Sequence, residues 1–412
     1  MSSVDLVSRV SKELLGVIQN APLSLVLLFL VTTILGAVSL FYFALFIAAP
    51  IPRCPLPSEK CFRTISPDGK TSSLQSLPCW QEKYKASKQA AEHKGDSTET
   101  VTIEEADLFM SVVVPAFNEE ERLEEMLQEA VDYLTEASSD TTGNVESSVV
   151  GNKTSSNGSA LQASRIAREK GWEVLVVSDG STDRTIETAL NFARTYQPAL
   201  ANGTASKHIS NKSRSDTRIP VGAIRVISLE HNRGKGGATI HGMRHVRGQY
   251  AVFADADGAS KFADLGKLVT ECQRIEDDNG RGVAVGSRAH LVGSEAVVQR
   301  SFLRNLLMHS FHVFLRLLTP PATAAIKDTQ CGFKLFSRSS LPYIIPYMHS
   351  EGWIFDVEML MLAESAGIPV AEVAVGWKEV KGSKLNVLRD SLGMAWGLAI
   401  LRGAWGFGVY RR

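Results

Sequence analysis

The sequence predicts an α/β fold, a Rossmann-like mixed sheet flanked by helices, with a membrane helix near the N-terminus. Two observations indicate the α/β class: short apolar runs of strand length recur along the chain, and several are followed by a polar turn and then by apolar residues at helical spacing. A third observation, the absence of charged residues from 21 to 52, predicts the membrane helix. We expect a short N-terminal segment (1–21), a transmembrane anchor (22–49), a linker (50–106), a folded domain (107–385) and a C-terminal membrane-interface helix (386–412). The stretch 50–106 is either a linker or a loosely packed lead-in, with at most a short helix around 80–92.

The apolar stretch 22–49 is long enough to cross a hydrocarbon core of ~30 Å with some tilt. A cleaved signal peptide is disfavoured, because the stretch is longer than the apolar region of such peptides. Arg9 and Lys12 precede it. Four basic residues follow it closely, at Arg53, Lys60, Arg63 and Lys70. Since cytoplasmic flanks carry an excess of Lys and Arg, this bias predicts that the bulk of the chain is cytosolic.

Charge and cysteine content exclude several classes of protein. The 44 basic and 44 acidic residues balance, so no overall field favours nucleic acid. The five cysteines are scattered and form no C-x-x-C pair, which argues against a zinc site and a disulfide framework.

Two stretches rich in Ser, Thr, Gly and Asn, 138–165 and 202–218, are expected to be surface insertions in the folded domain. They contain four N-x-S/T sequons, at Asn152, Asn157, Asn202 and Asn211. Glycosylation in a lumenal domain is one interpretation. Chance occurrence in such a composition is the other, and the charge bias and unpaired cysteines favour it.

The folded domain begins with two strand–turn–helix units. The strand 108–114 precedes the turn Pro115–Glu119, in which Asn118 is expected to cap the following helix. The strand 173–177 precedes SDGSTD, where Asp179 can accept hydrogen bonds from a base or a ribose. The alternative is that SDGSTD is only a turn and helix cap, because these residues favour both.

A third strand, 223–229, leads to NRGKGGA. Its glycines allow close backbone approach, and Arg233 and Lys235 add positive charge, so the stretch resembles a phosphate cradle at a helix start. It is not a Walker A motif, because the G-x-x-x-x-G-K-[ST] spacing is absent.

The fourth strand, 250–254, ends in DADGAS, with Asp255 and Asp257 one residue apart. In an extended segment, residues two apart point to the same side, so the two carboxylates can converge. A hard divalent cation, Mg²⁺ or Mn²⁺, is the natural partner of such a pair and is commonly shared with substrate phosphates. The alternative is an ordinary turn.

The remainder of the chain predicts further elements. A strand at 282–290 carries Arg288 near its end, and 300–318 forms an amphipathic helix that packs on the core or lies at a membrane interface. Asp356 begins a helix, either as a functional carboxylate or as an acid favoured by the helix dipole. The final stretch, rich in Trp, Gly and Leu, predicts interfacial helices.

Taken in order, VVPAFNEE, VSDGSTDRT, NRGKGGA and DADGAS resemble the motifs of a family 2 glycosyltransferase with a GT-A fold, over about residues 108–385. The blocks GSRAH, DTQCGFKLF, FDVEML and KGSKL are most similar to those of the dolichyl-phosphate β-glucosyltransferases.

The resemblance implies roles for particular residues. The donor nucleotide would contact Pro115, Ala116, Asn118, Glu119, Asp179, Ser181, Lys235, Asp255 and Ala256. The metal, Mg²⁺ or Mn²⁺, would be held by Asp255 and Asp257; the acceptor phosphate would meet Arg288 and Arg300; and Asp257 and Asp356 would be catalytic. Some relatives offer a metal ligand two residues after the second aspartate, where this chain has Ala259.

The implied reaction transfers glucose from UDP-glucose to dolichyl phosphate with inversion, for lipid-linked oligosaccharide assembly in protein N-glycosylation. The implied location is the endoplasmic reticulum membrane, with one span and a cytosolic catalytic domain. A dolichol-phosphate mannosyltransferase using GDP-mannose is the near alternative, and a catalytically inactive membrane-tethered scaffold is the alternative of another class.

Overall fold

The computed structural model describes residues 22–93, 101–139, 170–197, 219–291, 313–380 and 387–411. The chain forms two compact units: residues 51–399 form one, and residues 1–50 with 400–412 form the other. Several expectations lie outside the described residues: the four sequons, Arg300, most of the predicted helix 300–318 and the KGSKL block.

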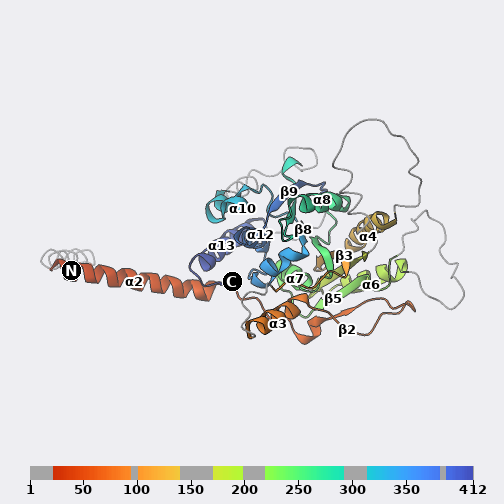
Figure 1. Ribbon diagram of the computed structural model, residues 1–412, viewed down its shortest axis with the longest axis horizontal. Helices are drawn as coiled ribbons and strands as arrows, with labels where there is room; N and C mark the ends of the chain where they lie inside the picture. The colour runs from red at the N-terminus through yellow and green to blue at the C-terminus, as the bar shows by residue number, and fades with distance from the viewer. Residues whose placement is uncertain are drawn as a thin grey trace, which may run out of the picture. The chain divides into compact units, whose positions relative to one another are not determined.

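The larger unit is built on one nine-stranded sheet, with the strand order β2-β1-β5-β4-β3-β6-β8-β7-β9. Figure 1 shows strands of this sheet, among them β3 and β5, surrounded by helices. The strands are β1 (Cys61–Arg63), β2 (Gln75–Ser76), β3 (Leu108–Ala116), β4 (Trp172–Asp179), β5 (Ile224–Leu229), β6 (Gly248–Ala254), β7 (Val283–Ser287), β8 (Phe333–Ser337) and β9 (Val370–Ala374). The central strands β5, β4, β3 and β6 are parallel, whereas β8 is antiparallel to both β6 and β7. The predicted mixed sheet is therefore confirmed.

Helices cover both faces of the sheet, as buried parallel strands require. Alternate residues of β3 show the two faces. Val112 and Val114 lie in the main hydrophobic core, together with residues of α4, α6 and α8. Val113 faces the opposite side, where α7 approaches so closely that a Cβ at Gly242 would lie 2.4 Å from its Cγ1.

The helices of this unit are α3 (Trp80–His93), α4 (Leu123–Ser139), α6 (Thr185–Tyr196), α7 (Gly234–Met243), α8 (Leu265–Ile275), α10 (Pro321–Ala325), α11 (Leu341–Ile344), α12 (Phe355–Ser365) and most of α13 (Val387–Gly406). The helices expected after β3, β4 and β5 are present as α4, α6 and α7. The C-terminal stretch is one helix, and residues 313–318 of the predicted helix 300–318 are helical.

The expectation of a linker at 50–106 is wrong where β1 joins the sheet, whereas the short helix expected around 80–92 is present as α3. Strand β1 pairs with β5 and extends the sheet, and the buried Thr64 Oγ1 donates to the Ile224 carbonyl at 2.6 Å. The indole of Trp80 donates to the Met243 carbonyl at 2.7 Å, which fixes α3 to the end of α7. These contacts join residues more than 150 positions apart, so the local composition gave no sign of them.

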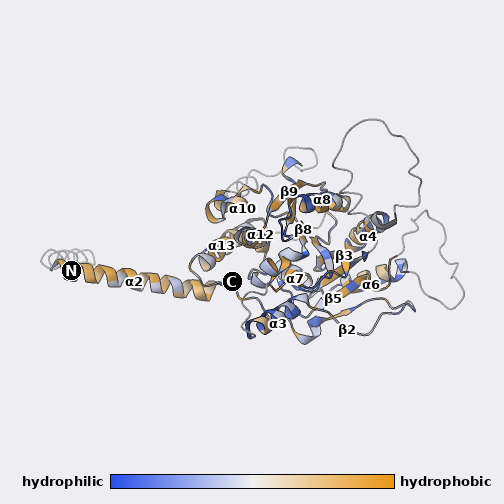
Figure 2. Ribbon diagram, in the orientation of Figure 1, coloured by the Kyte–Doolittle hydropathy of each residue, from blue (hydrophilic) through white to orange (hydrophobic). Residues whose placement is uncertain are grey.

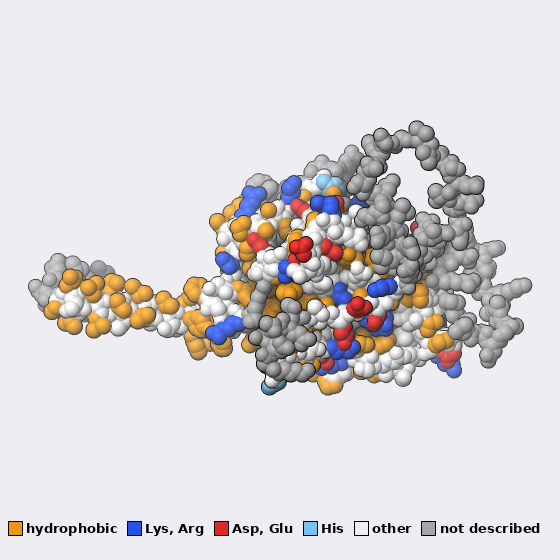
Figure 3. All heavy atoms as spheres, in the orientation of Figure 1, with side chains coloured by type: hydrophobic (Ala, Val, Ile, Leu, Met, Phe, Trp, Pro, Cys, Tyr) orange, Lys and Arg blue, Asp and Glu red, His pale blue; other side chains and the backbone are white. Residues whose placement is uncertain are grey.

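The smaller unit contains helix α2 (Leu23–Ala48), which by length and composition could cross a membrane. It is apolar along its length (Figure 2), and its side chains are exposed on the face seen in Figure 3. Within this unit Phe41 meets Phe407 edge to face at 5.3 Å, and Tyr410 Oη donates to the Pro50 carbonyl at 2.6 Å. The last turns of α2 are thus packed on the end of the chain.

Candidate active site

The carboxyl ends of β3, β4, β5 and β6 meet at one edge of the sheet, because these strands are parallel and adjacent. Each of the four motifs follows one of these ends. Ligands bind at this edge in open α/β sheets. The structure therefore brings together motifs that span about 140 residues of sequence, from β3 to the DADGAS loop.

Asp255 and Asp257 follow β6 and form the centre of the site. Lys235, in the first turn of α7, places its Nζ 2.6 Å from Asp255 Oδ1. Burial opposes the charge of Lys235, but attraction to Asp255 and Asp356 outweighs it, so its pKa is raised. Burial and the neighbouring Asp255 raise the pKa of Asp257, whose Oδ1 accepts a hydrogen bond from Ala259 N at 3.0 Å.

The two aspartates fit a divalent cation. They are two partly buried carboxylates whose mutual repulsion a cation would relieve, and oxygen is the ligand that Mg²⁺ and Mn²⁺ prefer. Among the described residues no group of three or more His, Cys, Asp or Glu side chains could hold a metal. This donor set suits a cation that completes its coordination with diphosphate oxygens and water.

Gly332, which sequence reasoning missed, lies directly against Asp255. Its carbonyl accepts a hydrogen bond from Asp255 N at 3.2 Å, and a Cβ built on it would lie 2.1 Å from Asp255 Oδ2. Only glycine leaves room for the carboxylate here. The DTQCGFKLF block contains this glycine, but local pattern did not connect it with β6.

Asp356, the expected catalytic carboxylate, is buried and paired with Lys334, a residue of β8 that sequence reasoning also missed. The Lys334 ammonium is fully buried, bonds to Asp356 and donates to the Cys331 carbonyl at 2.7 Å. Burial raises the pKa of Asp356, and the two lysines, Lys334 and Lys235, offset part of this rise. The signal that could have found Lys334 is a lone cation inside an apolar strand, FKLFS.

Arg288, expected to bind the acceptor phosphate, forms a bidentate pair with Asp328. Its Nε and Nη2 donate to the two Asp328 oxygens at 2.7 and 2.9 Å. Burial disfavours the arginine charge, but the Asp328 carboxylate outweighs it and raises the pKa of Arg288. The guanidinium lies 6.0 Å from the centre of the Trp377 ring. The second expected phosphate ligand, Arg300, lies outside the described residues.

The turns after β3 and β4 hold each other in place. Asn118 N donates to Ser181 Oγ at 3.1 Å, and Thr182 N donates to Asn118 Oδ1 at 2.8 Å. The expectation that Asn118 caps α4 is wrong: its φ is 53°, its side chain serves the neighbouring turn, and α4 begins at Leu123. Ser181 Oγ donates to the Ala116 carbonyl at 3.4 Å.

Three further expected nucleotide contacts have defined surroundings. Pro115 ends β3 with Ala116 and is buried, and Glu119 pairs with Arg122 at 2.6 Å. Ala256, expected against a ribose, has its methyl group in the hydrophobic core, so a ribose contact there would involve its backbone.

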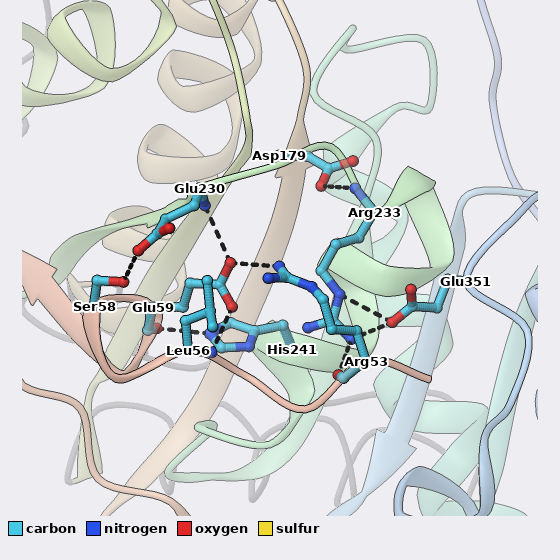
Figure 4. A network of polar contacts seen from close by, with 9 residues as sticks. All are labelled: Arg53, Leu56, Ser58, Glu59, Asp179, Glu230, Arg233, His241 and Glu351. Carbon is cyan, nitrogen blue, oxygen red and sulfur yellow. Dashed lines mark hydrogen bonds and ion pairs between the residues drawn. The ribbon is translucent and has the colours of Figure 1, made fainter. Parts of the chain in front are cut away.

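Arg233 is not the phosphate ligand that the cradle interpretation implied. Its guanidinium turns away and bonds to Glu351 and to the Arg53 carbonyl (Figure 4). The glycines of this loop have a packing role. A Cβ at Gly234 or Gly236 would lie 2.7 or 2.8 Å from the Glu351 carbonyl oxygen. Lys235 is thus the cation of NRGKGGA that contacts Asp255.

The backbone N–H of Arg233 donates to Asp179 Oδ1 at 2.7 Å. Burial raises the pKa of Asp179 to about 6, although hydrogen bonds from the backbones of Arg233 and Gly234 offset part of the rise. Asp179 is only 2% exposed.

Comparisons with known proteins identify a matching family and similar proteins. The family described as "Glycosyl transferase family 2" matches residues 217–343. A solved structure of glucosyl-3-phosphoglycerate synthase from Mycobacterium tuberculosis, in complex with Mg²⁺ and uridine-diphosphate, is similar with a TM-score of 0.41 and 17% identity, over 80% of this chain and 85% of that one.

Relatives of known name are similar over most of their length. The dolichyl-phosphate β-glucosyltransferase of Saccharomyces cerevisiae is 35% identical over 386 residues, which are 92% of this chain and 94% of the relative. The Homo sapiens protein of the same name is 37% identical over 304 residues, 72% of this chain and 77% of the relative. The resemblance noted in the sequence is confirmed, and so is the class of enzyme, a hexosyltransferase. The chain belongs to the dolichyl-phosphate β-glucosyltransferase family, within the family 2 glycosyltransferases.

Proposed function

We propose that this protein transfers glucose from UDP-glucose to dolichyl phosphate with inversion, giving dolichyl β-D-glucosyl phosphate and UDP. The observation that carries the proposal is membership of the family combined with Asp255, Asp257 and Lys235 at one edge of the sheet. The product would serve lipid-linked oligosaccharide assembly in protein N-glycosylation.

Asp255 and Asp257 would hold the Mg²⁺ or Mn²⁺. When bound, the cation supplies positive charge to the leaving diphosphate. The Lys235 ammonium, 2.6 Å from Asp255, would add a second positive charge. It would bind the donor when a diphosphate oxygen replaces the Asp255 carboxylate as its partner. Uridine would be held by the loops after β3 and β4, with Asp179, Asn118 and Ser181 as polar partners and Pro115, Ala116, Glu119 and Ala256 around them.

In the reaction, an oxygen of the acceptor phosphate forms a bond to C1 of glucose while the bond from C1 to UDP breaks. A phosphate monoester has a second pKa of roughly 6, so the nucleophile is already charged at neutral pH and needs no base to remove a proton. The pairing of Asp356 with Lys334 supports an electrostatic or orienting role for Asp356. Arg288 and Arg300 would bind the acceptor phosphate, and for Arg288 this means competition with Asp328.

Helix α2 would anchor the enzyme in the endoplasmic reticulum membrane as a single span, with the catalytic domain in the cytosol. Its length and apolar composition support the span, and the basic residues that follow it support the orientation. The polyprenyl chain of the acceptor would then stay in the bilayer.

The test is a donor panel with the full-length protein in membranes. Dolichyl phosphate is offered with UDP-glucose or GDP-mannose, in Mg²⁺, in Mn²⁺ or in a chelator. We expect a glucolipid from UDP-glucose, loss of product in chelator, and loss of product in Asp255→Ala and Asp257→Ala. Transfer from GDP-mannose alone would support a mannosyltransferase instead, and no transfer from any donor would support an inactive scaffold. Normal turnover by Asp257→Ala without added metal would contradict the metal site.

A further inference from the structure

The segment 51–60, which we call the leading segment, begins the larger unit. Its key residue is Glu59, whose side chain is fully buried. The Glu59 carboxylate accepts hydrogen bonds from Arg53 Nη2 at 2.6 Å, Leu56 N at 2.9 Å and Glu230 N at 3.1 Å (Figure 4). Burial opposes its ionisation, but these bonds outweigh the burial and lower the pKa of Glu59.

The backbone of Glu59 is also bonded. Its carbonyl lies 2.9 Å from His241 Nε2, on α7. Burial lowers the pKa of His241 to about 3, so the imidazole is neutral at physiological pH and donates from Nε2 to this carbonyl. The leading segment is therefore fixed to α7, the helix that carries Lys235, and to Glu230, which follows β5.

The same segment contacts the loop between β5 and α7 through Arg233. The Arg53 carbonyl accepts a hydrogen bond from Arg233 Nη2 at 2.6 Å, and Glu351 accepts one from Arg233 Nε at 2.9 Å. The Arg233 side chain is only 2% exposed, so it depends on these partners for solvation. Its own backbone N–H donates to Asp179 at 2.7 Å.

These contacts form a continuous series from Glu59 through Arg53 and Arg233 to Asp179 (Figure 4). We propose that Glu59 is a positioning residue of the donor site: it holds the Arg53 carbonyl where Arg233 needs it, and Arg233 in turn fixes Asp179 for the donor nucleotide. The inference rests on the proposed function, because it takes Asp179 as a nucleotide contact.

A purely structural role for Glu59 would lower stability and affect both substrates alike. A positioning role affects the KM of the donor and not that of the acceptor, because Asp179 is expected to contact the donor nucleotide and not the acceptor lipid. The decisive measurement is therefore the KM for UDP-glucose against the KM for dolichyl phosphate, supported by UDP affinity from calorimetry in the absence of turnover.

The variants are made in the full-length chain in detergent. Glu59→Gln keeps the size of the side chain and removes its charge. The matched control is Lys60→Met, at the next residue, which removes an exposed pair with Glu82 at 2.6 Å that is not linked to Arg233. We expect Glu59→Gln to raise the donor KM and the Kd for UDP by about fivefold to tenfold, since it weakens a charge-assisted hydrogen bond. The acceptor KM stays within about twofold, and Lys60→Met changes none of these constants.

Arg53→Met provides a second variant if Glu59→Gln does not fold. It breaks the contact with Glu59 but leaves the Arg53 carbonyl, and the Glu59 carboxylate keeps its two backbone donors, Leu56 N and Glu230 N. We expect a donor KM about threefold higher. An unchanged donor KM, or equal changes in both KM values, overturns the inference while leaving the proposed function intact. Failure of the wild-type chain to bind UDP overturns both.

Discussion

The absence of a side chain at Gly332 determines where the Asp255 carboxylate can lie. A Cβ at Gly332 would lie 2.1 Å from Asp255 Oδ2, far inside van der Waals contact. We expect Gly332→Ala to displace the carboxylate and lower kcat/KM by about 100-fold in the glucosyl transfer assay. Gly352→Ala is the control, because no heavy atom lies within 4 Å of its Cβ position. If both variants kept wild-type activity, Asp255 would not need its observed position.

The buried pair between Lys334 and Asp356 makes a prediction about stability. Removing one partner leaves an uncompensated charge in the interior, so we expect Lys334→Met to lose about 3–5 kcal/mol in the free energy of unfolding. The double variant Lys334→Met/Asp356→Leu should recover most of this loss, because neither charge remains. Denaturant titration of the three proteins measures the effect. Equal stability of Lys334→Met and wild type would show that the pair is not closed in solution.

We expect ionised Asp179 to lower the free energy of unfolding while it strengthens binding of the donor nucleotide. Its pKa in the folded chain, about 6, is above the ordinary value of 3.8. Such a group stabilises the fold fully only below the unfolded pKa, and the contribution is lost as pH rises through about 6. We expect Asp179→Asn to be about 1–3 kcal/mol more stable than wild type near pH 7, and no more stable below about pH 4. Thermal melts of both proteins across this pH range measure the sign of the stability difference.

The same substitution should weaken donor binding. Above about pH 6 the wild-type carboxylate is ionised, and under the proposed function it would accept hydrogen bonds from the nucleotide, so the donor KM should rise as pH falls through 6. Asp179→Asn should show a higher donor KM with no such step. A step of equal size in both proteins would assign the pH dependence to another group.

At the scale of the elements, the position of helix α7 is set by its packing against residues 350–352. Its glycines pack on residues 350–352, and the Gly237 N–H donates to the Glu351 carbonyl at 3.0 Å. The fully buried Glu358 of α12 holds this turn, by accepting hydrogen bonds from the backbones of His349 and Ser350. The position of Lys235 therefore depends on an element more than 100 residues away.

This packing predicts that a methyl group added at Gly236 of α7 lowers stability and weakens donor binding. A Cβ at Gly236 would lie 2.8 Å from both the Ser350 and Glu351 carbonyl oxygens. We expect Gly236→Ala to cost about 1–3 kcal/mol of stability and to raise the donor KM, because α7 must move away from the turn. Gly393→Ala in α13 is the helical control, since its Cβ would meet nothing within 4 Å. Wild-type melting and kinetics for Gly236→Ala would contradict this packing.

At the scale of the whole molecule, the folded unit starts much earlier than composition indicates. Residues 51–106 add β1 and β2 to the sheet and place Trp80 and Glu59 against α7. We expect a chain that begins at 51 to keep the cooperative melting of the larger unit, and a chain that begins at 107 to aggregate. Solubility and thermal unfolding of the two truncations measure this. A well-folded, active chain starting at 107 would contradict it.

Much of the protein could be predicted from sequence, because the signals are local. An uncharged apolar stretch predicts α2, and apolar runs ending in polar turns predict β3 to β6 and their helices. Parallel adjacent strands then bring their motifs to one edge, so the neighbourhood of Asp179, Lys235, Asp255 and Asp257 follows from topology. Even the family follows from the order of these motifs.

Only the tertiary structure decided which side chains face the site and which support it. Arg233 and Lys235 are two residues apart and equally charged, yet Lys235 contacts Asp255, whereas Arg233 turns to Glu351, 118 positions away. Lys334 and Gly332 acquire their roles from α12 and β6, and Glu59 acquires its role from β5 and α7. The physical reason is that a buried charge or a missing Cβ matters only through its partners, and those partners are distant in the sequence.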